Sequence, residues 1–239
     1  MHKTVQLFLC NDTKFIKMKE KQYHKDAFDR IDEERKNKIL EIGIEEFSSK
    51  GYEKANINII AKNAGISIGL MYKYFATKED LFMTCLKRGM DILEKALYDI
   101  MISDDKLLAK AENMIRAICF HSRRHSNYIK MYNEICAEKS SVERIKATVE
   151  EIEIKRSSIY ITTIGKALAN GEVRPDLDPR LFAYFLDNLL TTLQFSYTCD
   201  YYKEKLKIYT GVDVIENNEE QIIIQLLKFI ESAFTFEKK

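Results

Sequence analysis

Three consecutive polar-tipped residues, Tyr72–Tyr74, are followed four positions later by Lys78. Phenol O–H groups donate hydrogen bonds to phosphate oxygens, and an ammonium group adds charge for a phosphate or for an acceptor on a base edge. Lys78 would also stand beside the unpaired backbone N–H groups of a helix start, which bind phosphate. The neighbouring Met71 and Phe75 suit the core of a small helical bundle instead. This stretch therefore indicates contact with nucleic acid.

A second group that could do chemistry is the pair His121 and His125. Their spacing of four residues places both imidazoles on one helix face, an arrangement that can bind zinc. Between Arg116 and Tyr132 there is no Asp or Glu, and further cations surround the pair: Arg123, Arg124 and Lys130. Such surroundings would repel a cation, so we predict no metal site. A solvated basic face and a rim that attracts an anionic effector both stay open.

The chain offers little material for catalysis. It has 4 His, and no nucleophile–base spacing, phosphate-binding loop or cluster of metal ligands stands out. We therefore predict no enzyme and no cofactor. The 5 Cys are odd in number and lack a CxxC pair, which is typical of reduced thiols in a cytoplasmic protein. No run approaches the ~18–20 apolar residues of a membrane span, so we expect no membrane partner.

Composition and charge indicate an all-α protein with two unlike parts. Of 239 residues 46% are hydrophobic, and only 2 are Pro and 8 Gly. Residues 1–78 hold 15 Lys or Arg against 11 Asp or Glu, whereas residues 79–239 hold 23 against 26. A mildly basic head joined to a mildly acidic body suits a module that faces phosphate attached to one that does not.

Four helices would position the phosphate-binding stretch. Apolar periodicity and end signals predict them at about 32–50, 57–63, 68–74 and 78–102. Gly51 is a suitable residue just past the first helix, Asn56 can cap the second, and "TKED" at 77–80 is a capping-box pattern before the fourth. The second helix, the turn at 64–67 and the third helix would form a helix-turn-helix, whose third helix enters the major groove. Gly69 would let its backbone approach the bases.

From about 33 to 97 the sequence resembles the tetracycline-repressor (TetR) family of bacterial regulators. The segments that carry the resemblance are "RKNKILEIGIEEFSSKGY" and "INIIAKNAGISIGLMYKYFATKEDLF", with the spacing between them. The resemblance implies a DNA-binding head at 32–95 and a helical effector-binding and dimerisation body at 96–239. We expect residues 1–31 to be a disordered arm. Met18 begins a segment like a natural start, so residues 1–17 could be an over-extended reading frame.

Carried over by position, the resemblance implies a set of DNA contacts that spans the helix-turn-helix and the start of the fourth helix. Asn56 replaces the family's usual Thr or Ser cap, and Met71 replaces its usual Leu. The implied contacts are Asn56, Ser67, Ile68, Gly69, Leu70, Tyr72, Lys73, Tyr74 and Lys78.

The body is predicted to contain helices near 106–121, 124–138, 142–169, 179–203 and 217–236. Wide apolar faces on the last two indicate packing both inward and onto a second copy of the chain. We assign the dimer interface to Phe182, Leu186, Leu189, Leu190, Leu193, Ile223, Leu227, Ile230 and Phe234. Residue type alone suggests an effector pocket at Met114, Phe120, Tyr128, Met131, Tyr132, Phe185 and Phe195.

Together these features predict a transcriptional regulator, a repressor that binds a palindromic operator on double-stranded DNA as a homodimer. An apolar or amphipathic small molecule in the body would change the spacing of the two reading helices, which should be ~34–36 Å apart in the operator-competent state. Two alternatives are a helix-turn-helix protein without an effector and a helical enzyme.

Overall fold

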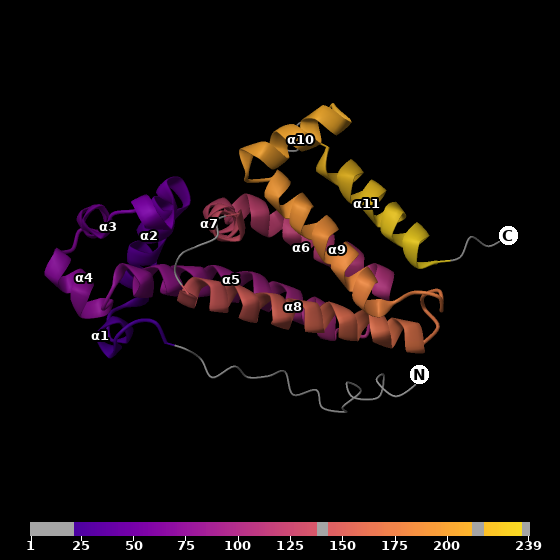
Figure 1. Ribbon diagram of the computed structural model, residues 1–239, viewed down its shortest axis with the longest axis horizontal. Coiled ribbons are helices and arrows are strands. Elements are labelled where there is room, and N and C mark those ends of the chain that lie inside the picture. The colour runs from indigo at the N-terminus through magenta and orange to yellow at the C-terminus, as the bar shows by residue number, and fades with distance from the viewer. Residues whose placement is uncertain (1–21, 138–142, 212–217, 236–239) are drawn as a thin grey trace.

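The computed structural model describes residues 22–137, 143–211 and 218–235, and within these ranges every regular element is a helix (Figure 1). The all-α prediction is therefore confirmed. The expected disorder of the arm and the hypothesis about residues 1–17 fall on residues 1–21, outside the described ranges. The helices are α1 Asp26–Asp29, α2 Glu33–Lys54, α3 Ile57–Ala64, α4 Ile68–Tyr74, α5 Lys78–Ile102, α6 Leu107–Arg124, α7 Ser126–Ala137, α8 Glu143–Ala169, α9 Pro179–Ser196, α10 Asp200–Thr210 and α11 Glu219–Phe234.

The head consists of α1 to α4 and the first turns of α5, and its helix ends are set by local chemistry. Asn56 and Ser67 cap α3 and α4 by accepting backbone N–H bonds at 2.9 and 3.1 Å. Thr77 and Asp80 form the predicted capping box at the start of α5. Gly65, in the turn between α3 and α4, has φ 73°, a conformation that glycine adopts without steric penalty. The two helices of the motif therefore follow each other through a tight turn.

Residues 22–31 belong to the head, which corrects their assignment to a disordered arm. Phe28 is 3% exposed, and its ring packs edge-on against Tyr74. Lys25 donates two hydrogen bonds to the last carbonyls of α4, from its backbone N to Tyr74 O and from Nζ to Tyr72 O. Sequence periodicity missed this segment because α1 is only one turn long and contributes a single buried side chain. The segment supports the C-terminal end of α4.

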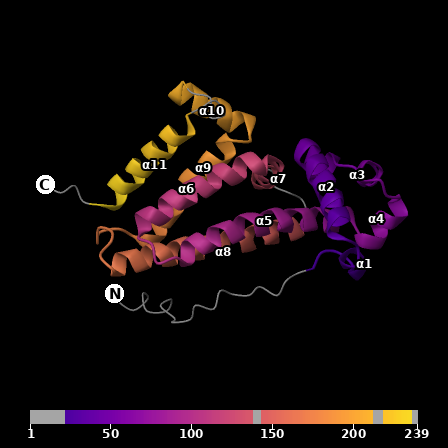
Figure 2. The ribbon, with the colours of Figure 1, turned by 180° about the vertical axis from the view of Figure 1, so that it is seen from behind.

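The long helices α5 and α8 run side by side below the rest of the body in both views (Figures 1 and 2). The head occupies one end of α5, and α6, α9 and α11 pack together over the other end around a second apolar core. The predicted helix at 179–203 is in fact two helices, because the chain bends at 197–199. There Tyr197 and Thr198 turn into the core, and the Tyr197 hydroxyl donates to Glu219 at 2.7 Å.

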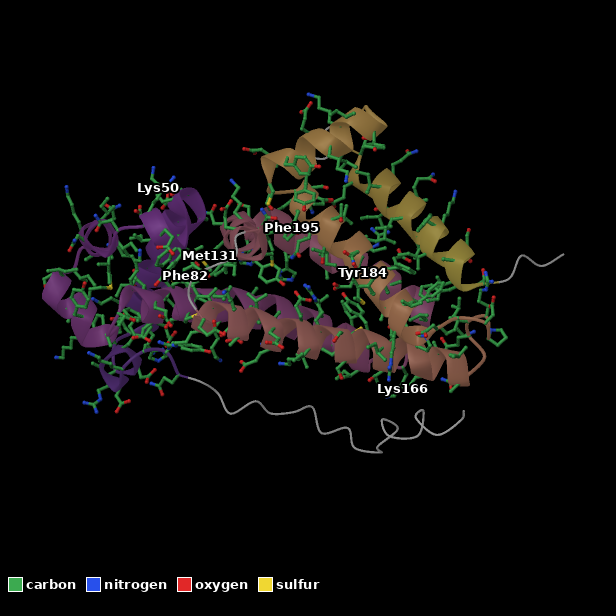
Figure 3. The ribbon with its side chains drawn as sticks, viewed as in Figure 1. Lys50, Phe82, Met131, Lys166, Tyr184 and Phe195 are labelled. Carbon is green, nitrogen blue, oxygen red and sulfur yellow. The ribbon has the colours of Figure 1, made fainter. Side chains whose placement is uncertain are left out.

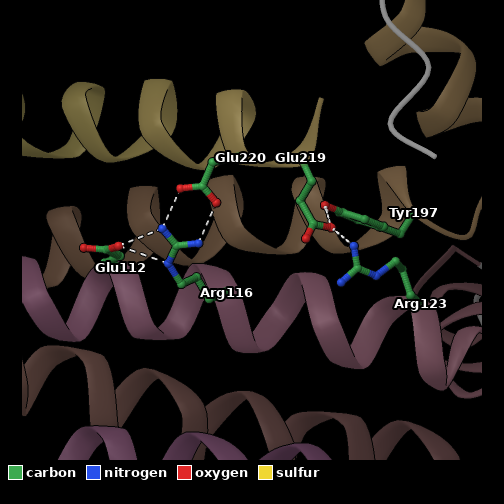
Figure 4. Close-up of polar contacts among 6 residues, drawn as sticks. All are labelled: Glu112, Arg116, Arg123, Tyr197, Glu219 and Glu220. Carbon is green, nitrogen blue, oxygen red and sulfur yellow. Dashed lines mark hydrogen bonds and ion pairs between the residues drawn. The ribbon is translucent and has the colours of Figure 1, made fainter. Parts of the chain in front are cut away.

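Charged residues fasten α11 to α6 (Figure 4). Arg116 binds both carboxylate oxygens of Glu220, at 2.7 and 2.8 Å, and also contacts Glu112. Arg123 forms an ion pair with Glu219, which accepts the Tyr197 hydroxyl as well. Two of the cations that form the basic cluster in the sequence are thus matched by carboxylates from a helix about a hundred residues further along the chain.

Head and body share one apolar core. Tyr128 and Met131 of α7 and Ile145 of α8 belong to the same cluster of buried side chains as Phe75 and Phe82 of the head. Figure 3 shows Phe82 and Met131 at the junction, where α7 packs along α2. The body therefore contacts the head through α7 as well as through the continuous helix α5.

Candidate DNA-binding and effector sites

The outer surface of α4 carries residues that the core does not require. Ile68 and Tyr72 are 38% and 45% exposed, and Ser67, Gly69 and Lys73 are also exposed. A Cβ added to Gly69 would meet no atom closer than Ser67 Oγ at 4.0 Å. Packing within the protein therefore does not explain this glycine. Because Gly69 has no side chain, the backbone of the N-terminal turn of α4 is exposed to solvent there.

Met71 and Phe75 are fully buried, as predicted from their types. The prediction that Tyr74 contacts DNA beside Tyr72 is wrong, because the side chain of Tyr74 is only 4% exposed. Its ring lies 5.6 Å from that of Phe28, in the core that the missed segment completes. We therefore remove Tyr74 from the predicted DNA contacts.

Lys78 is a second correction. Its Nζ donates to the carbonyls of Tyr52, Glu53 and Ala55 at 2.8, 3.0 and 3.3 Å, and it lies 4.7 Å from the centre of the Tyr52 ring. These carbonyls belong to the last turn of α2 and its end, after a kink at Gly51, and the ammonium satisfies them. All three Lys78 donors therefore bind the protein itself, so this side chain is not available for a phosphate.

The other predicted contacts differ in exposure. Asn56 is exposed, but its side chain is engaged in capping α3. Leu70 is half-buried against the head core, so it presents only part of its side chain. The surface that remains for a DNA groove is formed by Ser67, Ile68, Gly69, Tyr72 and Lys73.

The body contains a largely apolar cavity of ≈ 150 Å³ between α5, α6, α7 and α8. Four of the predicted pocket residues line it, namely Met114, Tyr128, Met131 and Tyr132. Three do not. Phe120 and Phe185 are about half exposed on the outside, and Phe195 packs against Tyr132 and Tyr202 behind the wall.

Sequence reasoning missed the contribution of α5 and α8 to this cavity. A Cβ on Gly89 of α5 would lie 2.1 Å from the Tyr128 ring, so the glycine is needed for close helix contact. An isolated glycine inside a helical pattern was the available signal. Lys155, Arg156 and Tyr160 of α8 line the opposite side. Their signal was lost because α8 is weakly amphipathic, with polar residues on most of its surface.

His121 and His125 both line the cavity, with nearly parallel rings 5.7 Å apart. Burial lowers the pKa of each imidazole below its ordinary value, and nearby cations act in the same direction. For His121 the positive charge comes from His125, when that ring is protonated, and from Arg124. Uncharged imidazoles at neutral pH are therefore favoured. Among the described residues no group of three or more His, Cys, Asp or Glu is arranged to hold a metal ion.

Tyr128 connects the cavity wall with the head. Its hydroxyl accepts a hydrogen bond from Arg88 Nε at 3.0 Å and donates to Glu41 Oε1 at 3.3 Å. Glu41 lies on α2, the first long helix of the head. A molecule that displaced the Tyr128 ring would therefore disturb a direct contact between body and head.

The predicted dimer residues are mostly inside the protomer. Six of them are at most 7% exposed because they form the inward stripes of α9 and α11: Leu186, Leu190, Leu193, Ile223, Ile230 and Phe234. Phe182, Leu189 and Leu227 are half-buried. The large apolar side chains that α9 and α11 expose are instead Leu181, Tyr184, Phe185, Ile224 and Phe229, of which Figure 3 labels Tyr184. Sequence could not tell inward from outward stripes, since both helices are apolar on more than one side.

In the part of the chain that the structure describes, no helix is both long and apolar enough to cross a membrane.

Known proteins resemble this chain in its head sequence and over most of its fold. The model of bacterial regulatory proteins of the tetR family matches residues 39–84. The HTH-type transcriptional repressor KstR2 of Mycobacterium tuberculosis (strain ATCC 25618 / H37Rv) is 24% identical over 152 residues, which are 64% of this chain and 76% of the repressor. The matched region therefore extends beyond the head.

Two solved structures share the fold at low sequence identity. FadR from Bacillus subtilis in complex with stearoyl-CoA has a TM-score of 0.64 and 18% identity, over 83% of this chain and 98% of that one. AibR in complex with isovaleryl coenzyme A and operator DNA has a TM-score of 0.63 and 17% identity, over 82% and 97%. The all-helical arrangement of head and body is thus that of known regulators.

Proposed function

Because the chain belongs to the tetR family of bacterial regulatory proteins and is a transcriptional regulator rather than an enzyme, we propose that it represses transcription as a homodimer on a palindromic operator. Each protomer would place α4 in the major groove. The observation that carries this proposal is the outer surface of α4, where an exposed tyrosine, an exposed lysine and a glycine without a packing role stand together.

In this arrangement Tyr72 and Lys73 contact phosphates and base edges, and Gly69 admits the DNA backbone or a base close to α4. Ser67 and Ile68 stand at the N-terminal end of the helix, nearest the bases. The two reading helices of the dimer would be ~34–36 Å apart, one turn of DNA.

The effector would be a small molecule with an apolar part that occupies the cavity between α5 and α8. Support comes from the apolar lining and from FadR and AibR, whose structures hold acyl thioesters of coenzyme A. Binding would change the equilibrium between two head spacings only if the molecule binds one state better than the other. The hydrogen bonds of Tyr128 to Arg88 and Glu41 would carry part of that difference to α2.

We propose that a second copy of the chain covers the outward apolar residues of α9 and α11. Charged substitutions such as Phe185→Asp and Phe229→Asp would then convert the dimer to a monomer in sedimentation experiments without unfolding it. Ile208→Asp on α10, at an apolar residue that is also exposed, is the control. Retention of the dimer in both α9 and α11 variants would place the interface elsewhere.

The function is tested by selecting DNA from a random library with the purified protein and footprinting the selected sequence. A palindromic footprint that weakens in Tyr72→Ala is the expected result. Absence of any selected sequence would contradict an operator-binding function. A footprint that no acyl-CoA or free acid changes would favour the second candidate, a DNA-binding protein without an effector.

A further inference from the structure

The lining of the cavity contains four basic side chains. They are His121, His125, Lys155 and Arg156, whereas no Asp or Glu is among the lining residues. The remaining lining is predominantly Leu, Ile, Met and Tyr. An apolar cavity with cationic or protonatable groups on its wall is suited to a molecule that is apolar over most of its surface and carries an anionic group.

Two of these four groups are already matched or partly matched. Arg156 forms ion pairs with Asp187 at 3.0 Å and Glu153 at 2.6 Å. Burial lowers the pKa of the Lys155 ammonium, whereas the negative charge of Asp91 on α5 raises it. Carboxylates therefore already offset the positive charge of the two α8 side chains, so these side chains alone do not account for the binding of an anion.

The histidine pair at the C-terminal end of α6 has different surroundings. The charged groups that act on it are Arg124 on α6, Arg88 on α5 and Glu41 on α2, so two cations and a single carboxylate face the two rings. The Tyr128 hydroxyl already binds that carboxylate. The pair can therefore gain a proton readily only if a further anion arrives.

His121 also lacks a polar partner. Its Nδ1 is buried and has no hydrogen-bond partner among the described residues. Buried polar atoms of this kind are rare in folded proteins, and an unmade hydrogen bond is unfavourable. Among the described residues Nδ1 thus has no hydrogen bond that holds the ring in its present rotamer.

We propose that the cavity takes an apolar carboxylic acid whose carboxylate lies against His121 and His125. This inference rests on the proposed function, in which the cavity is the effector site. The volume of ≈ 150 Å³ fits a ring or a short chain, since an engineered apolar cavity of about this size binds benzene. A bound carboxylate favours the protonated imidazole, so binding takes up a proton and strengthens as the pH falls.

The shared chemistry of a free acid and of an acyl thioester is the apolar chain, and the experiment separates them. Octanoate, octanol, octylamine and octanoyl-CoA are titrated into the purified full-length protein by calorimetry at pH 6, 7 and 8, without DNA. Octanoate should bind about tenfold or more tighter than octanol, the range expected for a charge-assisted hydrogen bond, and octylamine should bind weakest. Octanoate affinity should rise by up to about tenfold per unit of falling pH.

The variant His121→Gln/His125→Gln should remove most of the preference for octanoate over octanol and the pH dependence. A readout that needs no variant is the histidine Cε1–H resonance in NMR, which should report a higher pKa for both rings when octanoate is present. Equal binding of octanoate and octanol, binding of octanoyl-CoA but not of octanoate, or no binding of any probe would each overturn the proposal. Octanoate binding that leaves the operator complex unchanged would support the ligand class and count against the proposed function alone.

Discussion

Replacing Lys78 with Met tests whether this residue holds the protein or the DNA. The sequence position implies a phosphate contact, whereas the structure directs its ammonium to three carbonyls at the end of α2. Met keeps most of the length of the aliphatic stem and removes only the charge and the donors. The two assignments therefore predict opposite results.

The expected loss of stability follows from the geometry. A hydrogen bond to a charged group contributes about 1.5–3 kcal/mol, but one ammonium shared among three acceptors does not give three times that amount. The contact with the Tyr52 ring adds about 0.5–1 kcal/mol. We expect a decrease of roughly 2 kcal/mol in the free energy of unfolding, or ~4–8 °C in Tm for a chain of this size.

Urea denaturation and operator binding at several salt concentrations measure the two effects separately. Lys78→Met should lower stability and leave the slope of log affinity against log salt unchanged, because no phosphate contact is lost. Lys73→Met on the exposed side of α4 is the control, for which we expect unchanged stability and a reduced salt slope. Its stability should change by less than ~0.5 kcal/mol and its slope by about one phosphate. A Lys78→Met protein of parental stability with a reduced slope would refute the structural role.

Three further predictions concern the reading helix and the cavity. Gly69→Ala should retain or slightly increase thermal stability, since a Cβ there meets no close atom, yet weaken operator binding; unchanged affinity would mean that DNA does not approach this residue. Gly89→Ala drives a Cβ into the Tyr128 ring and should lower the free energy of unfolding by about 1–3 kcal/mol, and the same substitution should cost less in a Tyr128→Ala background, where the ring is absent. The pKa values of His121 and His125 are lowered in the folded state, so their contribution to stability is present above about pH 6.5 and is lost as the pH falls below it. Between about pH 7.5 and 5.5 the urea midpoint of the His121→Gln/His125→Gln variant should therefore decline less than that of the parent protein. An equal decline in both proteins would contradict the lowered pKa values.

The head was predictable from sequence because its signals are local. Caps at Asn56 and Thr77, glycines at chain turns and apolar spacing fix helix ends within a few residues. Tyr74 and Lys78 were misplaced because their roles depend on distant partners. Phe28 covers the Tyr74 ring, and the carbonyls at the end of α2 bind the Lys78 ammonium. Neither contact can be predicted from spacing along the chain.

The body was harder for the same physical reason. The cationic cluster around the two histidines lacks carboxylates in sequence, yet Glu219 and Glu220 reach it from α11. Likewise the inward stripe of α9 could not be distinguished from the outward one until α6 and α8 were known to lie against it. Residue type identified four of the seven proposed cavity residues, because buried Met and Tyr are frequent in such linings, but it could not find the glycine on α5.

The core shared by head and body links the stability of the cavity wall to that of the head. Since Tyr128 and Met131 line the cavity and also belong to the buried cluster that contains Phe82, local opening of α2 or α5 disturbs the packing of the cavity wall. A molecule bound there at a hundredfold excess over its Kd adds about 2.7 kcal/mol to the stability of every segment that must open with the cavity. Amide hydrogen exchange in α2 should therefore slow when a molecule binds in the cavity, although α2 does not line the cavity.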